Sequence, residues 1–319
     1  MDAFASLSQD EQVQRIELLG REALRQFGVE PVSVAPLVHA ENTTYRVDAK
    51  EGAFCLRVCR PDYQSDANVV SEIAFLAALS EAGFDVPRPY DSRVVKAAVP
   101  EVPEARNCVL LQWQEGEFAD DRFTSEQAKG VGRTMAETHG FSAQWIPPEG
   151  FSRQGLHDQV FERFVFESPV GFVEESNRQV LLETLKRSRK MLSGLERDRA
   201  NFGLIHGDMH RGNVLFDGDH VRLIDFDDLG WAYWIADFAA ALAYEVGKDQ
   251  FVEVREAMLT GYAEVRPLPS QTDKLLSGFL RMRFMTMANW ILQRTDNPKL
   301  REQAPRWIEM MVEGIRAVD

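Results

Sequence analysis

The stretch that decides the fold is His206-Gly207-Asp208-Met209-His210-Arg211-Gly212-Asn213, and two short apolar runs follow it. The runs are Val214 to Phe216 and Val221 to Ile224, and the turn Asp217-Gly218-Asp219 separates them. An Asp-Gly turn between two apolar runs is a strong signal for a β-hairpin. The sequence therefore predicts a polar loop that leads directly into a two-stranded hairpin.

Three polar side chains of this segment have the spacing of a site for phosphoryl transfer. Asp208 precedes the amide Asn213 by five residues, and Asp225 follows the second apolar run. In the protein-kinase catalytic loop an aspartate takes the proton of the attacking hydroxyl, and the asparagine binds magnesium; a later aspartate holds magnesium against the nucleotide phosphates. We therefore predict that Asp208 is the base, that Asn213 and Asp225 bind the metal, and that the hairpin gathers all three at a cleft.

A metal site for hydrolysis is the rival interpretation of the same loop. His206, Asp208 and His210 alternate, so an extended segment would place them on one face. The other histidines of the chain are His39, His139, His157 and His220. None of these has a second ligand at helical or strand spacing, and the missing context favours phosphoryl transfer over a metallohydrolase.

The loop from His206 to Asn213 closely resembles the catalytic loop of the aminoglycoside phosphotransferase and choline kinase-like family, and Ile224-Asp225-Phe226-Asp227 strengthens the match. The resemblance covers nearly the whole chain and is strongest over residues 203–240. It implies an α+β, two-lobed, protein-kinase-like fold with a small antiparallel-sheet N-lobe and a larger, mainly helical C-lobe. It also implies that ATP and Mg²⁺ are used to phosphorylate a hydroxyl group, usually on a small molecule.

Composition narrows the class of protein. Apolar residues make up 45% and charged residues 27% of the chain, which is ordinary for a soluble globular protein. The net charge of −14 argues against a general nucleic-acid binder, which needs a basic face. The start of the chain lacks the pattern of a signal peptide, and no apolar run reaches the roughly 18 residues of a membrane span. Three cysteines without a zinc pattern fit the reducing cytosol, so we expect a cytoplasmic protein with neither nucleic-acid nor membrane partners.

A cation and an acid in the N-terminal part are expected to steady the nucleotide phosphates. The strand 54–59 alternates, which places Cys55 and Arg57 on the same face. Kinases normally carry lysine at this position, and Arg57 keeps the charge while adding a rigid fork that can make two bonds. Glu72 is the only acid in the middle of the predicted helix 66–82, so it is the expected partner of Arg57. An exposed arginine and an unpaired surface glutamate are the alternatives.

Further nucleotide contacts follow from the resemblance. The segment His39 to Thr44 lies where a phosphate-covering loop is expected, yet it has no glycine. The family often tolerates that loss, with Glu-Asn at this point, so Asn42 is a candidate contact and a plain hairpin turn is the alternative. Cys55 is a second candidate beside Arg57. Backbone groups of Gln112 and Trp113, at the end of a buried strand, are expected to bind the adenine edge.

We expect a boundary directly after Trp113, with a nucleotide-binding lobe over residues 1–113 and a helical catalytic and substrate lobe over 114–319. Apolar spacing and capping residues predict the elements of both lobes. The expected helices span residues 8–27, 66–82, 124–139, 174–197, 250–264, 271–293 and 298–317. The expected strands outside the hairpin are 36–38, 43–47, 54–59 and 107–112. Met282, Met285 and Met287 are interpreted as core, with a substrate pocket as the alternative.

Three further residues are expected to act on the loop rather than on the substrate. The resemblance implies that Asp237, at the start of a helix, braces the catalytic loop, although an ordinary N-terminal helix acid is an equally good interpretation. His206 and His210 are expected to position the loop, because the reaction needs no second strong base.

The sequence does not identify the acceptor. Aminoglycosides, choline-type alcohols, homoserine, sugars and protein serines are all used on similar scaffolds, and a fold does not settle a function. A stress-response Ser/Thr protein kinase or a homoserine kinase is therefore the alternative within the kinases. A nucleotide-binding protein without catalysis is a remoter alternative, because Asp208, Asn213 and Asp225 are all present. The preference for ATP over GTP and the oligomeric state also stay open.

Overall fold

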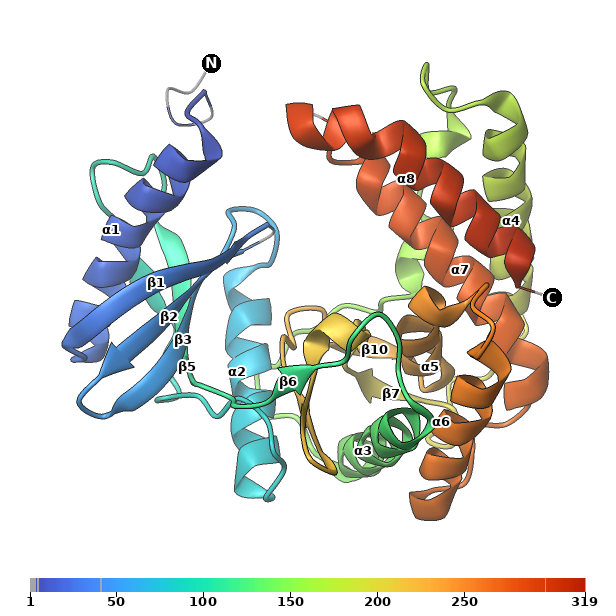
Figure 1. Cartoon of the computed structure of the whole chain (residues 1–319), viewed down its shortest axis with the longest axis horizontal. Coiled ribbons are helices and arrows are strands. Elements are labelled where there is room, and N and C mark those ends of the chain that lie inside the picture. Colours follow the sequence, from blue (N-terminus) through green and yellow to red (C-terminus); the bar gives the residue numbers. More distant parts are fainter. Residues whose placement is uncertain (1–3, 5, 41, 296, 319) are drawn as a thin grey trace. The chain divides into compact units, whose positions relative to one another are not determined.

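The computed structural model describes residue 4 and residues 6–40, 42–295 and 297–318 (Figure 1). The chain divides into two compact units, and each is described by itself. The first unit comprises Met1–Glu115 and Ile146–Arg153, and the second comprises Gly116–Trp145 and Gln154–Asp319. Within the described residues, no helix combines the length and the apolar character that a membrane crossing requires.

The first unit is built on a five-stranded antiparallel sheet with the order β1-β2-β3-β5-β4. Its strands are β1 (Pro31–His39), β2 (Thr43–Ala49), β3 (Gly52–Val58), β4 (Val95–Ala97) and β5 (Arg106–Gln112). Hydrophobic alternation predicted four of these strands, and β1 is longer than expected. The three-residue β4 was not predicted, because so short a strand has too few residues to show a period.

Two helices complete the first unit. Helix α1 (Gln9–Phe27) begins at a capping box formed by Ser8 and Glu11 and ends at Gly28, which has φ +79°. Its side chains Ile16, Leu19 and Leu24 are buried in a cluster with Leu56 and Val58 of β3. Helix α2 (Asp66–Glu81) is capped by Ser65 and buries Glu72 among apolar neighbours. Both helices were predicted within a residue of their observed bounds.

The second unit is mainly helical. Its helices are α3 (Ser125–Gln144), α4 (Glu175–Ser193), α5 (Ile235–Leu242), α6 (Phe251–Val265), α7 (Thr272–Leu292) and α8 (Pro298–Ala317). Four 3₁₀ turns are η1 (Asp158–Phe161), η2 (Val165–Glu167), η3 (Arg211–Asn213) and η4 (Ala243–Glu245). The predicted α+β fold class, with a small antiparallel sheet and a larger helical part, is therefore confirmed.

Two small sheets in the second unit flank the loop from His206 to Asn213. One contains β6 (Glu117–Phe118), β8 (Val214–Asp217) and β9 (His220–Leu223), and the other pairs β7 (Phe202–Ile205) with β10 (Gly230–Tyr233). Strands β8 and β9 are the predicted hairpin. Strands β6, β7 and β10 were not predicted. At Gly203 in β7 a side chain would overlap the ring of Trp234, so only glycine permits this close approach.

One segment belongs to a different unit from the one that the sequence suggested. Residues Ile146–Arg153 pack with the first unit, whereas the predicted lobe boundary placed them in the second. The backbone amide of Ser152 donates to Ser71 Oγ at 2.7 Å, and Arg153 Nη1 donates to the carbonyl oxygen of Asn68 at 3.1 Å. A loop carries no periodic pattern, so its packing partner cannot be read from the sequence. The division into a nucleotide-binding and a catalytic lobe stays a prediction.

Candidate active site

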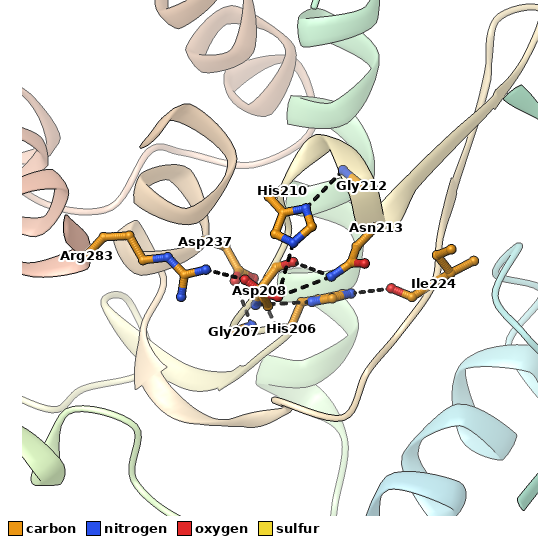
Figure 2. A network of polar contacts seen from close by, with 9 residues as sticks. All are labelled: His206, Gly207, Asp208, His210, Gly212, Asn213, Ile224, Asp237 and Arg283. Carbon is orange, nitrogen blue, oxygen red and sulfur yellow. Dashed lines mark hydrogen bonds and ion pairs between the residues drawn. The ribbon is translucent and has the colours of Figure 1, made fainter. Parts of the chain in front are cut away.

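The loop from His206 to Asn213 is fixed from behind by Asp237 of α5 (Figure 2). Asp237 is fully buried; its Oδ2 accepts from the amide of His206 at 3.1 Å and its Oδ1 from the amide of Gly207 at 2.8 Å. Gly207 has φ +86°, and a side chain there would collide with the carbonyl oxygen of Asp228. The bracing role implied for Asp237 is present in the geometry, because two charge-assisted bonds join the helix to the loop.

A buried chain of polar groups holds Asp237 in turn. His139 Nε2 of α3 lies 3.1 Å from Asp237 Oδ2, and His139 Nδ1 lies 3.1 Å from the hydroxyl of Tyr262 on α6. Burial lowers the pKa of His139, although Asp237 acts in the opposite direction. A neutral ring satisfies all three groups when Nε2 donates to Asp237 and Nδ1 accepts from Tyr262. No local pattern signals this role of His139, since its partners lie 98 and 123 residues away along the chain.

His206 joins the loop to the hairpin. Its Nδ1 accepts from the amide of Asp208 at 3.3 Å, and its Nε2 donates to the carbonyl oxygen of Ile224 at 3.0 Å. The amide of Ile224 donates to the carbonyl oxygen of Asn213 at 3.0 Å. Both ring nitrogens of His206 are therefore engaged in holding the loop, as expected for a positioning residue. The same contacts argue against the metallohydrolase interpretation, which needs one of these nitrogens for a metal.

Asp225 directly follows Ile224, so these bonds bring it to the same end of the hairpin as Asn213. It is exposed and has φ +61°. A residue other than glycine rarely adopts this left-handed conformation, and such strain gathers at functional sites. Within the described residues, no three or more His, Cys, Asp or Glu side chains form a potential metal cluster. The predicted magnesium pair is not of that type, since it consists of one amide and one carboxylate.

Asp208 lies at the centre of the polar network in Figure 2. Asn213 Nδ2 donates to the carbonyl oxygen of Asp208 at 2.9 Å and to its Oδ2 at 3.3 Å. His210 Nδ1 accepts from the amide of Gly212 at 2.9 Å, which leaves Nε2 to donate to Asp208 Oδ2 at 3.3 Å. Because the amide nitrogen of Asn213 is engaged by Asp208, its amide oxygen is turned away and available to a cation (Figure 2).

An arginine that was not predicted from the sequence also contacts the Asp208 carboxylate. Arg283 of α7 donates from Nη2 to Asp208 Oδ1. Burial by itself raises the pKa of Asp208, but Arg283 and His210 outweigh burial and hold that pKa below its usual range. The sequence predicts that the methionines of this helix belong to the core, and Met282 and Met285 are indeed buried. A charged residue between the apolar Met282 and Phe284 was the available signal.

In the first unit, Arg57 and Glu72 form the contact that the sequence predicted. Arg57 Nη1 donates to Glu72 Oε1 at 2.9 Å, and Nη2 donates to Oε2 at 2.6 Å. The side chains are 4% and 0% exposed, so the alternatives of a surface arginine and a surface glutamate are wrong. The pairing is therefore structural fact, whereas its action on nucleotide phosphates stays a prediction.

The other four residues predicted to contact the nucleotide lie in or next to strands of the first unit. Asn42 Oδ1 accepts from the amide of Arg60 at 3.1 Å; Glu41 beside it lies outside the described residues. Cys55 is half-buried on β3. The amide of Gln112 donates to the carbonyl oxygen of Arg88 at 2.8 Å, and the amide of Trp113 donates to that of Ala53 at 3.0 Å. Both amides are thus engaged within the sheet, and the role of these four residues stays a prediction.

Comparison with known proteins decides the family. A sequence model of the phosphotransferase enzyme family matches residues 33–275, which is most of the chain. The chain belongs to the phosphotransferase enzyme family. The amicoumacin kinase of Bacillus subtilis (strain 168) is 24% identical over 294 residues, covering 86% of this chain and 84% of that relative.

Solved structures of kinases are similar along nearly the whole chain. A microcompartment-associated aminopropanol kinase has a TM-score of 0.78 and 25% identity, and the match covers 93% of this chain and 95% of that one. An amicoumacin kinase solved with AMP-PNP, Ca²⁺ and Ami has a TM-score of 0.77 and 19% identity over 96% of both chains. The protein-kinase-like fold is therefore confirmed, and the protein is a phosphotransferase.

Proposed function

We propose that this phosphotransferase moves the γ-phosphate of ATP to a hydroxyl group of a small molecule, with Asp208 orienting that hydroxyl. The observation that carries the proposal is the catalytic loop itself. Asp237 fixes the loop backbone, Asn213 and His210 fix the Asp208 carboxylate, and Asp225 follows at the end of the hairpin. A positioned carboxylate next to an amide oxygen and a second carboxylate is what phosphoryl transfer to an alcohol requires.

The reaction assigns one task to Asp208. The acceptor hydroxyl donates its hydrogen bond to the Asp208 carboxylate, and its oxygen forms the new bond to the γ-phosphorus. The bond between that phosphorus and the oxygen bridging to ADP breaks, and the hydroxyl proton passes to Asp208. Since the pKa of Asp208 lies below its usual range, Asp208 orients the hydroxyl more than it pulls on the proton. A carboxylate that orients the hydroxyl without removing its proton early suits a transition state in which charge lies mainly on the transferred phosphoryl group.

Asn213 and Asp225 are the proposed ligands of Mg²⁺. Their side chains offer oxygen atoms, which this hard cation prefers as ligands, so the residues present fit the metal. Bound there, Mg²⁺ would neutralise charge on the nucleotide phosphates. Support comes from the similar amicoumacin kinase, which was solved with a nucleotide analogue and Ca²⁺.

Arg57 is the proposed cation for the nucleotide phosphates, held in place by Glu72. A guanidinium whose direction is fixed by two bonds is pre-organised, so less entropy is lost when a phosphate binds. Asn42, Cys55, Gln112 and Trp113 remain proposed neighbours of the nucleotide. A cytosolic location is also proposed, because Cys55, Cys59 and Cys108 form no disulfide within the described residues.

Thermal unfolding with and without Mg-ATP tests this proposal. The nucleotide should raise the melting temperature of the wild type, since a ligand that binds only the folded state stabilises it. Asp225→Ala should lose most of that shift, because the phosphates lose their counter-ion, while Asp208→Asn should keep it. If Asp208→Asn abolished ATP binding but spared turnover at saturation, the two roles would be wrongly assigned. No shift in folded wild type at millimolar Mg-ATP would overturn the proposed function.

A further inference from the structure

The Asp208 carboxylate has acceptor places for about four donors, and three of them are taken, so the acceptor hydroxyl has to share Oδ1 with Arg283. Oδ2 already receives Asn213 and His210, and Oδ1 receives Arg283. Asn213 and His210 belong to the loop and lie within five residues of Asp208. Arg283 instead reaches Asp208 from α7, 75 residues further along the chain. Arg283 is therefore the partner that can leave while the loop keeps its shape.

Arg283 uses little of its bonding capacity on Asp208. A guanidinium has five N–H donors in a flat fork, which matches the two oxygens of a carboxylate. Within the described residues, Arg283 Nε is buried without a hydrogen-bond partner. The Arg283 and Asp208 side chains are 22% and 21% exposed, so a small ligand can reach both. Arg283 thus makes one hydrogen bond to Asp208 and leaves its buried Nε–H without a partner among the described residues. An unsatisfied buried donor costs free energy, so a ligand that pairs with more of the guanidinium would bind favourably.

The surroundings of this pair carry a second arginine. Tyr244 of η4 packs edge-on against His210, with ring centroids 5.4 Å apart, and is 39% exposed. Burial raises the pKa of Tyr244, and both Arg283 and Arg211 act against that rise. Arg211 is held by the carbonyl oxygen of Asp120 at 3.1 Å. Asp228 also acts on Arg283, so the group is not uniformly basic. Two cations, Arg283 and Arg211, and one carboxylate, Asp208, thus act on the pKa of Tyr244.

We propose that the acceptor carries a carboxylate, and that Arg283 leaves Asp208 to bind it when the acceptor enters. This inference rests on the proposed function and adds the class of substrate: short hydroxy acids, including hydroxy amino acids. The acceptor carboxylate engages two guanidinium nitrogens, which satisfies the fork. Asp208 Oδ1 is then free for the acceptor hydroxyl. An alcohol without a carboxylate would leave Arg283 bound to Asp208. A polycationic acceptor would be repelled by the positive charge of Arg283.

Matched pairs of acceptors test the inference, each pair differing only in the carboxylate. Suitable pairs are serine with ethanolamine, homoserine with 3-aminopropan-1-ol, and 4-hydroxybutanoate with propan-1-ol. ADP release is measured with Mg-ATP and wild-type protein. For at least one pair, kcat/KM of the acid should exceed that of its analogue by about thirtyfold or more. This is the usual contribution of hydrogen bonds between charged groups.

Variants at position 283 connect that preference to the guanidinium. Arg283→Met should lower kcat/KM for the acid about thirtyfold more than it lowers kcat/KM for the analogue, mainly through KM. Arg283→Lys should keep part of the preference, because it supplies charge without the fork. Arg281→Met is the matched control on the same helix, since Arg281 donates to the carbonyl oxygen of Val318 and not to Asp208. This control should keep the full preference.

Each contrary result has a separate meaning. Equal turnover of both members of every pair, turnover of analogues only, or no turnover of any acid overturns the carboxylate inference. An acid preference that survives Arg283→Met overturns the role of Arg283. The proposed function survives all of these if Mg-ATP still raises the melting temperature. The proposed function itself fails if Mg-ATP gives no thermal shift in folded wild-type protein, a result that does not depend on which acceptors are tried.

Discussion

Arg57 and Arg283 each donate to a carboxylate, one in each compact unit, and their surroundings differ. Arg57 makes two bonds to Glu72, and the side chains are 4% and 0% exposed. Arg283 donates from one nitrogen to Asp208, and the side chains are 22% and 21% exposed. A buried pair with two bonds keeps both side chains in one fixed direction, whereas an accessible one-point contact can be exchanged. The first contact is suited to holding a structure and the second to responding to a ligand.

The largest expected effect is at the exchangeable contact, on turnover. Asp208→Asn should lower kcat by about a hundredfold or more, because the acceptor loses its positioned base. The amide is nearly isosteric, so folding and the thermal shift with Mg-ATP should be kept. Steady-state kinetics beside thermal unfolding check both statements. A variant with unchanged kcat would remove Asp208 from the chemistry.

The next largest effect is on stability, at the buried contact. Arg57→Ala or Glu72→Ala should lower the free energy of unfolding by about 3–5 kcal/mol, because each leaves an uncompensated buried charge. The double variant should be little worse than Arg57→Ala alone, since both changes remove one interaction. Arg57→Lys should recover part of the loss. Chemical denaturation measures all four variants; independent, additive losses would show that the two residues are not energetic partners.

A buried carboxylate in the second unit should behave like Glu72 rather than like Asp208. Asp237→Asn places an amide group against backbone N–H donors, so at least one donor is left unsatisfied. The free energy of unfolding should fall by about 1–3 kcal/mol. Turnover should fall as well, because the catalytic loop loses its brace. If stability were unchanged, the loop would not depend on the bonds from Asp237 to His206 and Gly207.

Removing Arg283 should change a pKa more than it changes stability. Arg283→Met should alter the free energy of unfolding by less than about 1 kcal/mol, as for other accessible ion pairs. Burial raises the pKa of Asp208 and Arg283 lowers it, so the variant should have the higher pKa. Since protonated Asp208 cannot accept a proton, activity of the variant should be lost at a higher pH than in the wild type. A pH profile of kcat/KM measures this shift, and an unmoved acid limb would contradict it.

The smallest effect on turnover is expected at Tyr262, at the end of the buried chain behind the loop. Tyr262→Phe removes the hydroxyl that bonds His139 Nδ1, and the free energy of unfolding should fall by about 1 kcal/mol. Asp237 keeps both backbone bonds to the loop in this variant, so kcat should change less than twofold. Thermal unfolding and steady-state kinetics provide the comparison with Asp237→Asn. A large loss of turnover would show that His139 must be held from both sides.

Contacts between neighbouring residues explain what the sequence alone predicted well. The hairpin β8–β9 was visible because its turn and its two apolar runs are adjacent in the chain. The capping box at Ser8 and Glu11 marked the start of α1 for the same reason. The pairing of Arg57 with Glu72 was predictable across 15 residues because a recognised motif supplied the expectation. Strands β7 and β10 were not predicted, because each has only four residues and the two pair with each other although the loop and the hairpin separate them in sequence.

By itself, then, the sequence determined the order of the elements, the loop from His206 to Asn213 and the identity of Asp208 as its centre. These depend on interactions over a few residues, which a linear pattern records. Only the tertiary structure brought Arg283 to Asp208 over 75 residues and His139 to Asp237 over 98. Such contacts are decided by how helices pack, and an arginine or a histidine within a helix looks the same in sequence whether it meets solvent or a carboxylate. The state of the catalytic carboxylate is therefore a property of the folded chain.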